Sequence, residues 1–565
     1  MGPYMQSSKS HSSFMVTISI SVIIVLLCVY SALFIYRSSV LIDGDRYFSL
    51  FDDAMVSMRY ASNIIVGNGF VWNAGGEKVE GTTNLLWTLY MALCHLVPIS
   101  ESKVGLVVQL TGMLILIITV LVTSRLAGVI SENSPFVVIT SAFLTAFCYP
   151  LIFWTLRGME VGLLTLLVIS AVFIAIRALS TTQFSCIQYV LLGIAVLSRL
   201  DMVMPFIVLL FFSAWADKQH RSKHVWIGLL ILSVAVGSQT LWRLYYFGEW
   251  LPNTYYLKLT GFPFLPRVLR GLWVTLQWMV VFIPIAFLLP SAVLFSLSKH
   301  LGMLLAIPMA QVLYNIYVGG DAWERLGFAN RYLTIAMPSI ILLLAFTTDK
   351  LYFSEKPKNN LSPRSWSSTN ILPKILAVVT VFFALNGLPY ETSVLGMSLV
   401  KPLYVDYDIQ KIREALWLKG NTKPDATIAV YSAGTLPYFA HRPTIDILGK
   451  SDKYISKLPM RLPNDNQPAV NPWSNWRLFW PGHMKYDYNY SIGQLQPDVV
   501  QGLWDNEEQG THFLDKDYIK VDMGKTGGDC WFHRNSPNIL WKNINLPRES
   551  GPVLRPYLSW ANKCY

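Results

Sequence analysis

Charged residues are scarce in this sequence. Asp, Glu, Lys and Arg make up 14% of its 565 residues, whereas hydrophobic residues make up 53%. Charges occupy about a quarter of an average soluble domain, so this composition excludes an ordinary soluble protein. Aromatic residues are plentiful, with 19 Trp among them. The profile is typical of a protein that crosses a membrane several times.

Several chemical motifs are also missing. The chain has no GxxxxGK[ST] loop to hold the phosphates of a nucleotide, and no CxxC pair or His/Cys spacing typical of zinc. Four of its six cysteines lie in or near apolar runs, where they are expected to behave as small apolar residues: Cys28, Cys94, Cys148 and Cys186. Cys530 and Cys564 lie near the C-terminus, and the sequence leaves open whether they form a disulfide.

The chain does contain long apolar runs. A helix of roughly 17–25 apolar residues crosses a bilayer, and the chain has five clear runs and seven shorter ones: 14–36, 104–123, 225–244, 272–297 and 301–318, then 84–98, 135–155, 159–176, 186–198, 200–216, 332–347 and 373–390. The first run is too long, and too poorly followed by small residues, for a cleaved signal. It is therefore expected to remain as the first span.

The positive net charge of +11 indicates orientation and not nucleic-acid binding. Lys and Arg collect at 217–224 and 349–366, and cytoplasmic loops are enriched in these residues. The second cluster includes the low-complexity stretch SPRSWSSTN, expected to be a cytoplasmic linker. The segments 245–271 and 319–331 and everything after 390 then lie outside, together with the first loop.

This orientation requires an odd number of spans, so about eleven of the twelve candidates are expected to cross. Either 186–198 and 200–216 form one helix broken at Arg199 and Asp201, which we favour, or 84–98 is a shallow helix. The predicted fold is a polytopic α-helical membrane protein at 1–390, with its first outer loop at 38–83. A soluble extracytoplasmic α/β domain is predicted at 391–565.

The predicted terminal domain has its own strand signals. TIAVYSAG (427–434), RPTIDILG (442–449) and PDVVQGLW (497–504) read as strands, and the intervening TLPYFAH reads as a short helix or turn. A segment of this length suffices for an independent core.

Two adjacent acids, Asp52 and Asp53, follow the first span in the run FDDAMVSMRY. Carboxylates at a membrane surface lose hydration and repel each other, and both effects raise one pKa toward that of a useful base. The alternative role is an N-cap for a helix that starts at Ala54. At least one of the two is predicted to be catalytic. Arg59 lies near the same helical face as Asp52, either as an ion-pair partner or as an anion-binding group.

Two further outer loops carry charge. RLYYFGEWLPNTYYLK (243–258) contains Arg243 and Lys258, which are candidates for neutralising a phosphate at the level of the lipid headgroups. GGDAWERLGFANRY (319–332) supplies a dense set of charges, for which pairing within the loop is the alternative: Asp321, Glu324, Arg325 and Arg331. Most of the aromatic residues are expected in the membrane interface belt.

The order and spacing of several motifs resemble a known family: FDDAMVSMRY, EKVEGTTNLLW, LRGME, YYFGEWLPNTYYLK, GGDAWERLGFANRY, AGTLPYFAHRPTIDILGKSD and PGHMKYDY. They resemble the bacterial GT-C glycosyltransferases of the mycobacterial arabinofuranosyltransferase B type, from about Asp52 into the terminal domain. The resemblance implies an enzyme of the bacterial inner membrane with an extracytoplasmic active site. It takes a sugar, expected to be D-arabinofuranose, from a polyprenyl-phosphate donor.

The resemblance also implies roles for individual residues. Asp52 or Asp53 is the expected base, and the donor phosphate is expected at Arg59, Lys258, Arg331 and Arg243. The candidates for binding the acceptor or a sugar are Trp72, Glu80, Asn84, Asn253, Tyr255, Asp321, His441 and His483. The motif LRGME departs from the usual small-Gly-Leu-Glu-Thr pattern, so no role is assigned to Glu160.

The expected partners are the lipid donor, membrane lipid, and a glycan, lipid-linked glycan or protein acceptor, with no nucleic acid. No cofactor is required, and a divalent cation near Asp52 and Asp53 is left open because hard cations prefer carboxylate oxygens. The alternative function is a transporter or flippase for a lipid-linked sugar, with Arg199 and Asp201 on its path. A non-catalytic assembly or receptor subunit is a third. The concentration of charge in outer loops, and the absence of a repeated half, favour the enzyme.

Overall fold

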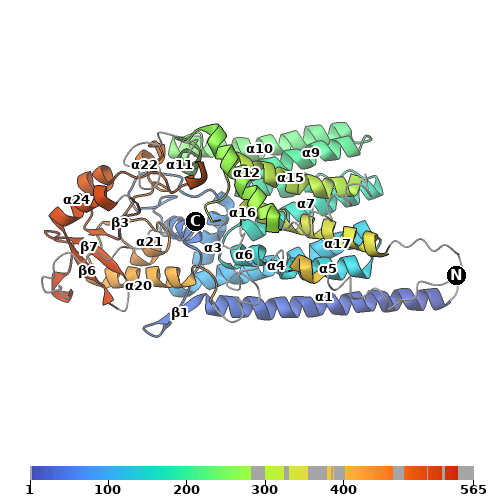
Figure 1. Cartoon of the computed structure of the whole chain (residues 1–565), viewed down its shortest axis with the longest axis horizontal. Coiled ribbons are helices and arrows are strands. Elements are labelled where there is room, and N and C mark those ends of the chain that lie inside the picture. The colour runs from blue at the N-terminus through green and yellow to red at the C-terminus, as the bar shows by residue number, and fades with distance from the viewer. Residues whose placement is uncertain are drawn as a thin grey trace.

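The computed structural model describes residues 3–281, 299–323, 330–353, 378–382, 386, 401–461, 476–505, 507–524 and 528–544. A bundle of helices forms one part of the molecule, and a domain that contains a β-sheet lies at one end of it (Figure 1). The chain starts at the opposite end of the bundle, where α1 (Pro3–Arg37) begins.

Five described helices are long and apolar enough to cross a membrane: α1 from Ser13, α4 (Glu101–Ser131), α7 (Val161–Thr181), α10 (Arg221–Phe247) and α15 (Lys299–Val318). The short helices α5 (Pro135–Ala146) and α6 (Tyr149–Leu156) pass the same test as a pair bent by 45°. The remaining helices of the bundle are α8 (Ile187–Ser198), α9 (Val203–Ala216), α12 (Phe264–Val281) and α17 (Met337–Phe353).

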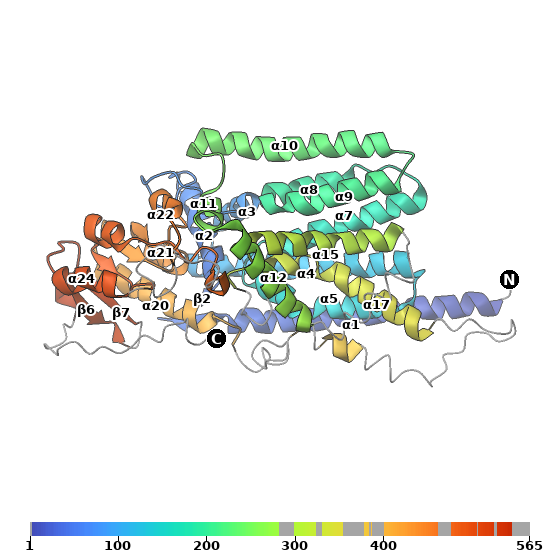
Figure 2. The ribbon, with the colours of Figure 1, turned by 45° about the horizontal axis from the view of Figure 1, so that its top comes forward.

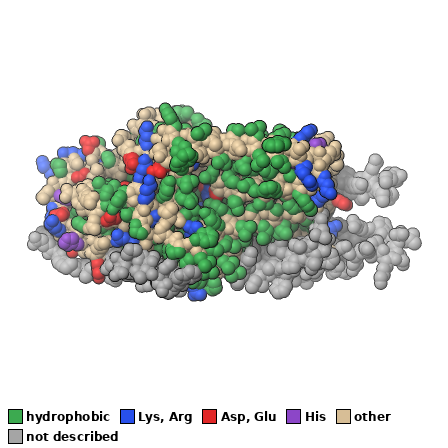
Figure 3. Space-filling view, turned by 90° about the horizontal axis from the view of Figure 1, so that it is seen from above, with side chains coloured by type: hydrophobic (Ala, Val, Ile, Leu, Met, Phe, Trp, Pro, Cys, Tyr) green, Lys and Arg blue, Asp and Glu red, His purple; other side chains and the backbone are tan. Residues whose placement is uncertain are grey.

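Apolar side chains cover the flank of the bundle (Figure 3). They lie between a charged zone beside the terminal domain and a group of Lys and Arg at the far end. Helix α10 runs along the edge of the bundle beside α8 and α9 (Figure 2), and only 17% of its apolar window is buried. Uncharged, apolar helix surface of this extent is stable in lipid and not in water. The chain is a multi-pass membrane protein.

Helices α8 and α9 form an antiparallel hairpin, so the expectation of one broken helix is wrong. His224 Nδ1 lies 2.7 Å from the hydroxyl of Tyr189 at the start of α8, and His224 Nε2 lies 3.2 Å from Asp217 just after α9. At the other end of the hairpin, Arg199 bonds to Glu160 at 2.7 Å. The chain reverses there because Arg199 is extended, with φ −151°, and a single 3-10 turn (Leu200–Met202) follows.

The shallow helix is instead α3 (Leu85–His95), as in the second alternative. Near its start, the indole nitrogen of Trp87 donates to the carbonyl of Gly158 at 2.8 Å. At its end, His95 Nε2 lies 2.9 Å from the hydroxyl of Tyr438 in the terminal domain. Both ends of α3 therefore lie at the domain end of the bundle. The described helices are consistent with about eleven spans, although most of 373–390 lies outside the described residues.

The terminal domain has a mixed five-stranded sheet with strand order β4-β3-β5-β7-β6. Strands β3 (Ile428–Val430), β4 (Thr444–Asp446) and β5 (Val499–Val500) are parallel, and β7 is antiparallel to both β5 and β6. These three strands and α21 (Thr435–Ala440) confirm the predicted elements. The other elements were not predicted: α20 (Val405–Asn421), α22 (Lys453–Lys457), α24 (Glu507–Asp517), β6 (Tyr518–Asp522) and β7 (Asp529–His533).

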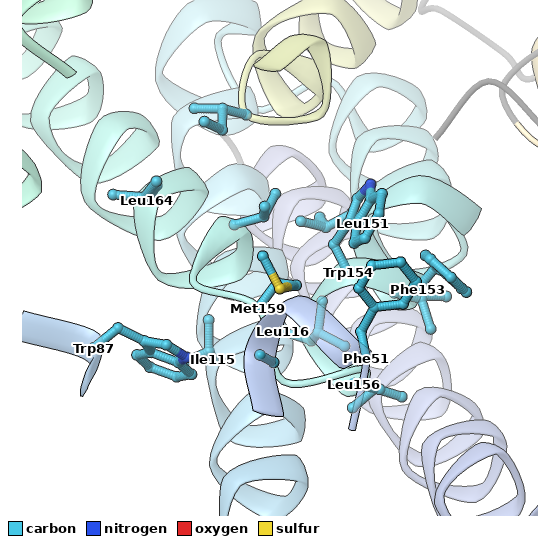
Figure 4. Packing of buried hydrophobic residues seen from close by; sticks show 14 of the residues in the cluster. Phe51, Trp87, Ile115, Leu116, Leu151, Phe153, Trp154, Leu156, Met159 and Leu164 are labelled. Carbon is cyan, nitrogen blue, oxygen red and sulfur yellow. The ribbon is translucent and has the colours of Figure 1, made fainter. Parts of the chain in front are cut away.

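Several short elements lie where the bundle meets the terminal domain: the hairpin β1 (Ser39–Ile42) and β2 (Asp45–Phe48), then α2 (Asp52–Ile65), α11 (Asn253–Leu259) and α16 (Arg331–Thr334). Phe51 anchors the start of α2, because its buried ring packs edge-on against Trp154 at 5.2 Å (Figure 4). Its backbone nitrogen donates to the carbonyl of Arg157 at 2.8 Å. The residue before the two acids is therefore held by the bundle core.

A buried ion pair joins the terminal domain to the bundle. Arg157, after α6, bonds to Asp408 on α20, and both side chains are excluded from water. Burial raises the pKa of Asp408, and the guanidinium of Arg157 opposes this shift. Arg157 also donates to the carbonyls of Ser49 and Leu50, at 3.0 and 3.2 Å. Residues 49–50, which lead into the two acids, are thus bonded to Arg157, and Arg157 is itself bonded to the terminal domain.

Candidate active site

A pocket lies at the junction of the bundle and the terminal domain, with about 420 Å³ of open space including its mouth. Its lining includes four cations and two carboxylates: Arg199, Lys258, Arg331, Lys450, Asp53 and Glu160. The excess of positive charge, beside the end of a membrane-spanning bundle, suits an anionic group at the level of the lipid headgroups.

Of the two adjacent acids, Asp53 is the one that lines this pocket. One carboxylate oxygen bonds to Lys450 Nζ at 2.7 Å, and the other bonds to Arg331 Nη1 at 2.8 Å. The second oxygen also accepts from the indole of Trp323 at 3.3 Å. Burial acts to raise the pKa of Asp53, but Lys450 and Arg331 together hold it well below the usual range. Asp53 is therefore ionised at neutral pH, and its side chain is 21% exposed.

Asp52 points toward the terminal domain. Its carboxylate accepts from the backbone nitrogen of Thr435, the first residue of α21, at 2.8 Å. Burial raises its pKa. Helix α2 begins at Asp52 with Phe51 at its N-cap, so neither acid caps a helix starting at Ala54. Asp52 instead caps a helix of the other domain, where the positive end of the helix dipole favours a carboxylate.

Arg331 is oriented by a second acid. Asp321 binds Arg331 Nε at 2.9 Å and Nη2 at 2.6 Å, a two-point contact that leaves Nη1 for Asp53. Asn330 caps α16 by accepting from the backbone nitrogens of Tyr332 and Leu333, at 3.0 and 3.1 Å. The predicted pairing of Asp321 and Arg331 within this loop is present. Glu324 and Arg325 lie outside the described residues.

Two lysines enter the pocket from different parts of the chain. Lys258, on α11, has no ion-pair partner within the part of the chain that the structure describes. Burial, reinforced by nearby Arg331, lowers its pKa to about 8. Lys450 comes from the loop after β4 in the terminal domain. Lys450 lies in the motif AGTLPYFAHRPTIDILGKSD but was not a predicted site residue, because nothing local in the sequence indicated that it meets Asp53.

The amide of Asn253 holds the two lysine-bearing segments together. Its Nδ2 donates to the carbonyls of Gly449, Lys450 and Asp452, at 2.9, 3.0 and 3.2 Å. Its Oδ1 accepts from the hydroxyl of Ser456 at 2.6 Å. Asn253 begins α11, the helix that carries Lys258. Its amide therefore links α11 to the Lys450 loop.

The opposite wall of the pocket is built around Glu160. Its carboxylate accepts from Arg199 at 2.7 Å and from the amide of Asn84 at 2.8 Å. Arg199 also makes a two-point contact with Asp201, with both distances at 2.9 Å. Asn84 was a candidate for sugar binding, whereas Glu160 was left without a role. The sequence offered one signal for this contact: Glu160 and Arg199 are opposite charges, and each lies at the end of an apolar run.

Other predicted residues lie outside the pocket lining. Arg59 donates to the carbonyls of Trp72 and Arg442, at 2.6 and 2.8 Å, and to Asn73 Oδ1 at 2.7 Å. The indole of Trp72 donates to the carbonyl of Ala433 at 3.1 Å. Both side chains fasten the first outer loop to the terminal domain.

The remaining candidates are dispersed. Arg243 pairs with Glu80 in a buried contact. The ring of Tyr255 packs edge-on against Tyr256, and His441, whose side chain is 43% exposed, contacts Glu101 at 2.8 Å. Of the predicted set, the structure brings Asp53, Asn84, Lys258 and Arg331 to the pocket.

Whether a divalent cation binds near Asp52 and Asp53 stays open. Within the described residues, no three His, Cys, Asp or Glu side chains are grouped as metal ligands. Both oxygens of Asp53 already contact cationic side chains, and Asp52 faces Thr435. Cys530 is buried and Cys564 lies outside the described residues, so whether they form a disulfide stays open.

Comparison with solved structures finds proteins of similar shape. The Archaeoglobus fulgidus oligosaccharyltransferase, solved with Zn and sulfate, aligns with a TM-score of 0.52 and 12% identity, over 90% of this chain and 73% of its own. ArnT from Cupriavidus metallidurans, in the apo state, aligns with a TM-score of 0.51 and 11% identity, over 75% of this chain and 85% of its own. The chain has the GT-C fold.

A family model described as a domain of unknown function (DUF8728) matches residues 405–533 of this GT-C chain, which lie in its terminal domain. No curated protein matches the sequence.

Proposed function

We propose that this GT-C protein is a glycosyltransferase that moves a sugar from a polyprenyl-phosphate donor to a hydroxyl of a cell-envelope glycan or glycoprotein. The observation that carries the proposal is an ionised carboxylate, Asp53, in a pocket lined by Lys258, Arg331 and Lys450 beside the membrane-spanning helices. The GT-C fold, shared with an oligosaccharyltransferase and ArnT, supports the same class of reaction.

The charges of the pocket match the donor. A polyprenyl-phosphate sugar keeps its chain in lipid and its phosphate at the headgroup level, where cations bind it. Lys258 forms no ion pair within the described residues, although Asp53 and Asp321 lie close enough to favour its charged form, and its pKa of about 8 leaves it mainly protonated at neutral pH. Arg331 adds a planar guanidinium already oriented by Asp321. Lys258 and Arg331 are therefore the proposed phosphate ligands.

Asp53 is the proposed base. It takes the proton from the acceptor hydroxyl as that oxygen bonds to the anomeric carbon of the sugar. The bond from that carbon to the phosphate oxygen breaks, and its electron pair leaves on the polyprenyl phosphate, which Lys258 and Arg331 stabilise. Donor binding also supplies a second anion to the cations that hold down the pKa of Asp53. Sharing them raises this pKa and strengthens Asp53 as a base.

The resemblance of the loop motifs favours D-arabinofuranose as the sugar and an extracytoplasmic site in a bacterial inner membrane. The flippase alternative draws no support from Arg199 and Asp201, because Arg199 lines the pocket and Asp201 bonds to it at 2.9 Å. We therefore propose the transferase and not the flippase.

Asp53→Asn is the decisive variant, and Asp52→Asn is its matched control. The lipid that copurifies with the protein is first identified by mass spectrometry, and transfer is then measured from a short-chain polyprenyl-phosphoryl arabinofuranose. General-base catalysis contributes about 10²–10⁴-fold, so Asp53→Asn should lose at least about 100-fold in kcat while still binding donor. Asp52→Asn keeps an oxygen for Thr435 and should stay within a few-fold of the wild type.

The proposal fails if Asp53→Asn transfers sugar at the wild-type rate. It also fails if wild-type protein in vesicles moves the lipid-linked sugar across the bilayer without forming product, which would favour the flippase.

A further inference from the structure

Four aromatic side chains form a cluster beside Asp53, called here the aromatic wall: Trp323, Trp480, His483 and Trp504. His483 stacks on Trp480 with ring centroids 4.7 Å apart, and both rings lie 5.3 Å from Trp504. Trp323 meets His483 edge-on at 5.6 Å. All four rings are half-buried, so part of the wall remains accessible.

Hydrogen bonds fix the three indoles in place. The Trp480 and Trp504 indoles each donate at 3.0 Å, to the carbonyls of Ala322 and His483 respectively. Trp323 donates to the carboxylate of Asp53 itself. Trp323 belongs to the bundle and the other three residues belong to the terminal domain, so the wall crosses the junction at the proposed base. A platform whose rings are already ordered binds a partner at a lower entropic cost.

His483 adds a free hydrogen-bond acceptor to this wall. Its Nδ1 lies 3.1 Å from the carbonyl of Pro481. A carbonyl only accepts, so Nδ1 carries the proton and Nε2 presents a lone pair. Within the described ranges, no donor reaches Nε2. Burial lowers the pKa of His483 to about 4, which keeps the ring neutral at physiological pH. Nε2 is thus available to a hydroxyl group.

We propose that the aromatic wall and His483 Nε2 form the acceptor subsite, and that the acceptor is a glycan rather than a protein. This inference rests on the proposed function. One face of a sugar ring is lined by C–H groups and packs on aromatic rings, while hydroxyls around its edge donate hydrogen bonds. The wall offers both kinds of contact. Because Trp323 bonds directly to Asp53, a sugar held here has a hydroxyl beside the base.

Two variants separate the two kinds of contact. His483→Phe keeps an aromatic ring but removes the acceptor Nε2 together with the Nδ1 contact to Pro481. Trp504→Leu removes a stacking surface together with the indole bond to the His483 carbonyl. Trp541→Leu is the matched control, because Trp541 is another half-buried indole of the terminal domain that donates to a carbonyl, that of Ser536, and packs on Phe532. Apparent melting temperature in detergent confirms that each variant is folded.

The measurements are the acceptor KM, kcat, the donor KM, and donor hydrolysis without acceptor, with an arabino-oligosaccharide as the acceptor probe. A lost contact worth about 1.4 kcal/mol is a tenfold change, so both wall variants should raise the acceptor KM by about tenfold. Donor KM and donor hydrolysis should stay within about twofold of the wild type, and Trp541→Leu should change none of them. Acceptor KM values unchanged in both wall variants would overturn the subsite, as would transfer to peptides in preference to glycans.

A separate readout distinguishes this inference from the proposed function. Quenching of tryptophan fluorescence by the oligosaccharide needs no donor and no turnover. If the wild type neither transfers nor hydrolyses polyprenyl-phosphate sugars, the transferase proposal fails. An apparent Kd for the oligosaccharide, measured from this quenching, that rises about tenfold in Trp504→Leu and His483→Phe would still support the glycan subsite. An apparent Kd that is unchanged in both variants would reject it.

Discussion

A carboxylate flanked by two cations loses its proton readily, and Asp53 is in this state. Asp52, one residue earlier, lies in a buried position where its pKa is raised and its oxygen caps α21. Adjacent residues on a helix point about 100° apart, so the two acids serve different neighbours. The sequence predicted that at least one of the two acids is catalytic. The contacts of each side chain make Asp53, which lines the pocket, the candidate.

Lys450→Met tests the electrostatic state of Asp53. The variant removes a positive charge bonded at 2.7 Å, and the pKa of Asp53 rises as a result. A base acts only when ionised, so the acid limb of the pH profile of kcat/KM should move to higher pH. At neutral pH Asp53 stays mainly ionised, because Arg331 still bonds to it at 2.8 Å, so the expected change is the shift of the acid limb. The pH profile of kcat/KM is the measurement.

Lys453→Met is the control for this experiment, because Lys453 bonds to Glu77 and to the carbonyl of Phe247 instead of Asp53. Its profile should overlay that of the wild type. An acid limb that stays in place in Lys450→Met would contradict the assignment of Asp53 as the base.

Helices α2 and α21 approach each other closely at Gly434. A Cβ atom at this position would lie 1.9 Å from the carbonyl oxygen of Asp52. Gly434→Ala should therefore push α21 away from α2 and break the bond between Asp52 and Thr435. Overpacking of this kind costs about 1–3 kcal/mol, so we expect a lower apparent melting temperature in detergent and reduced transfer activity.

Gly420→Ala provides the comparison, because a Cβ atom there meets nothing within 4 Å. Gly420 lies in α20, and Ala favours helix over Gly by about 0.5–1 kcal/mol. This variant should melt at the wild-type temperature or slightly above it. Equal melting temperatures for the Gly434 and Gly420 variants would show that the α2–α21 contact does not limit stability.

Local patterns predicted many of the elements. The long apolar runs became helices in the part of the chain that the structure describes, which leaves out 282–298. The strand patterns around Ile428, Thr444 and Val499 became β3, β4 and β5. The hairpin of α8 and α9 was missed because each helix is short, so the pattern does not distinguish one broken span from two antiparallel ones. The contacts of His224 with Tyr189 and Asp217 decide between them.

At the scale of the whole molecule, two opposite ends define the orientation. The terminal domain lies at one end, and the start of α10 with its Lys and Arg lies at the other (Figure 1). Cys186, which is exposed, precedes α8 at this second end. Tyr454 is 48% exposed in the terminal domain. The predicted orientation puts Cys186 in the cytoplasm and Tyr454 outside.

A membrane-impermeant maleimide tests this orientation in intact cells, with labelling followed by a mass shift on a gel. In a Cys564→Ser background, the Tyr454→Cys variant should be labelled at once. The parent protein, which retains Cys186, should be labelled only after the membrane is permeabilised. The reverse pattern would invert the protein and place the pocket on the cytoplasmic side.

The sequence by itself determined that the chain crosses a membrane, which loops carry its charges, and that a separate α/β domain follows. A lipid environment forces apolar runs into helices that satisfy their own backbone, so local composition is sufficient for these conclusions. Only the tertiary structure decided which charges meet. Asp53 bonds to Lys450, 397 residues later in the chain. That contact depends on how the terminal domain packs on the bundle, and no local pattern of residues encodes such a distant pairing.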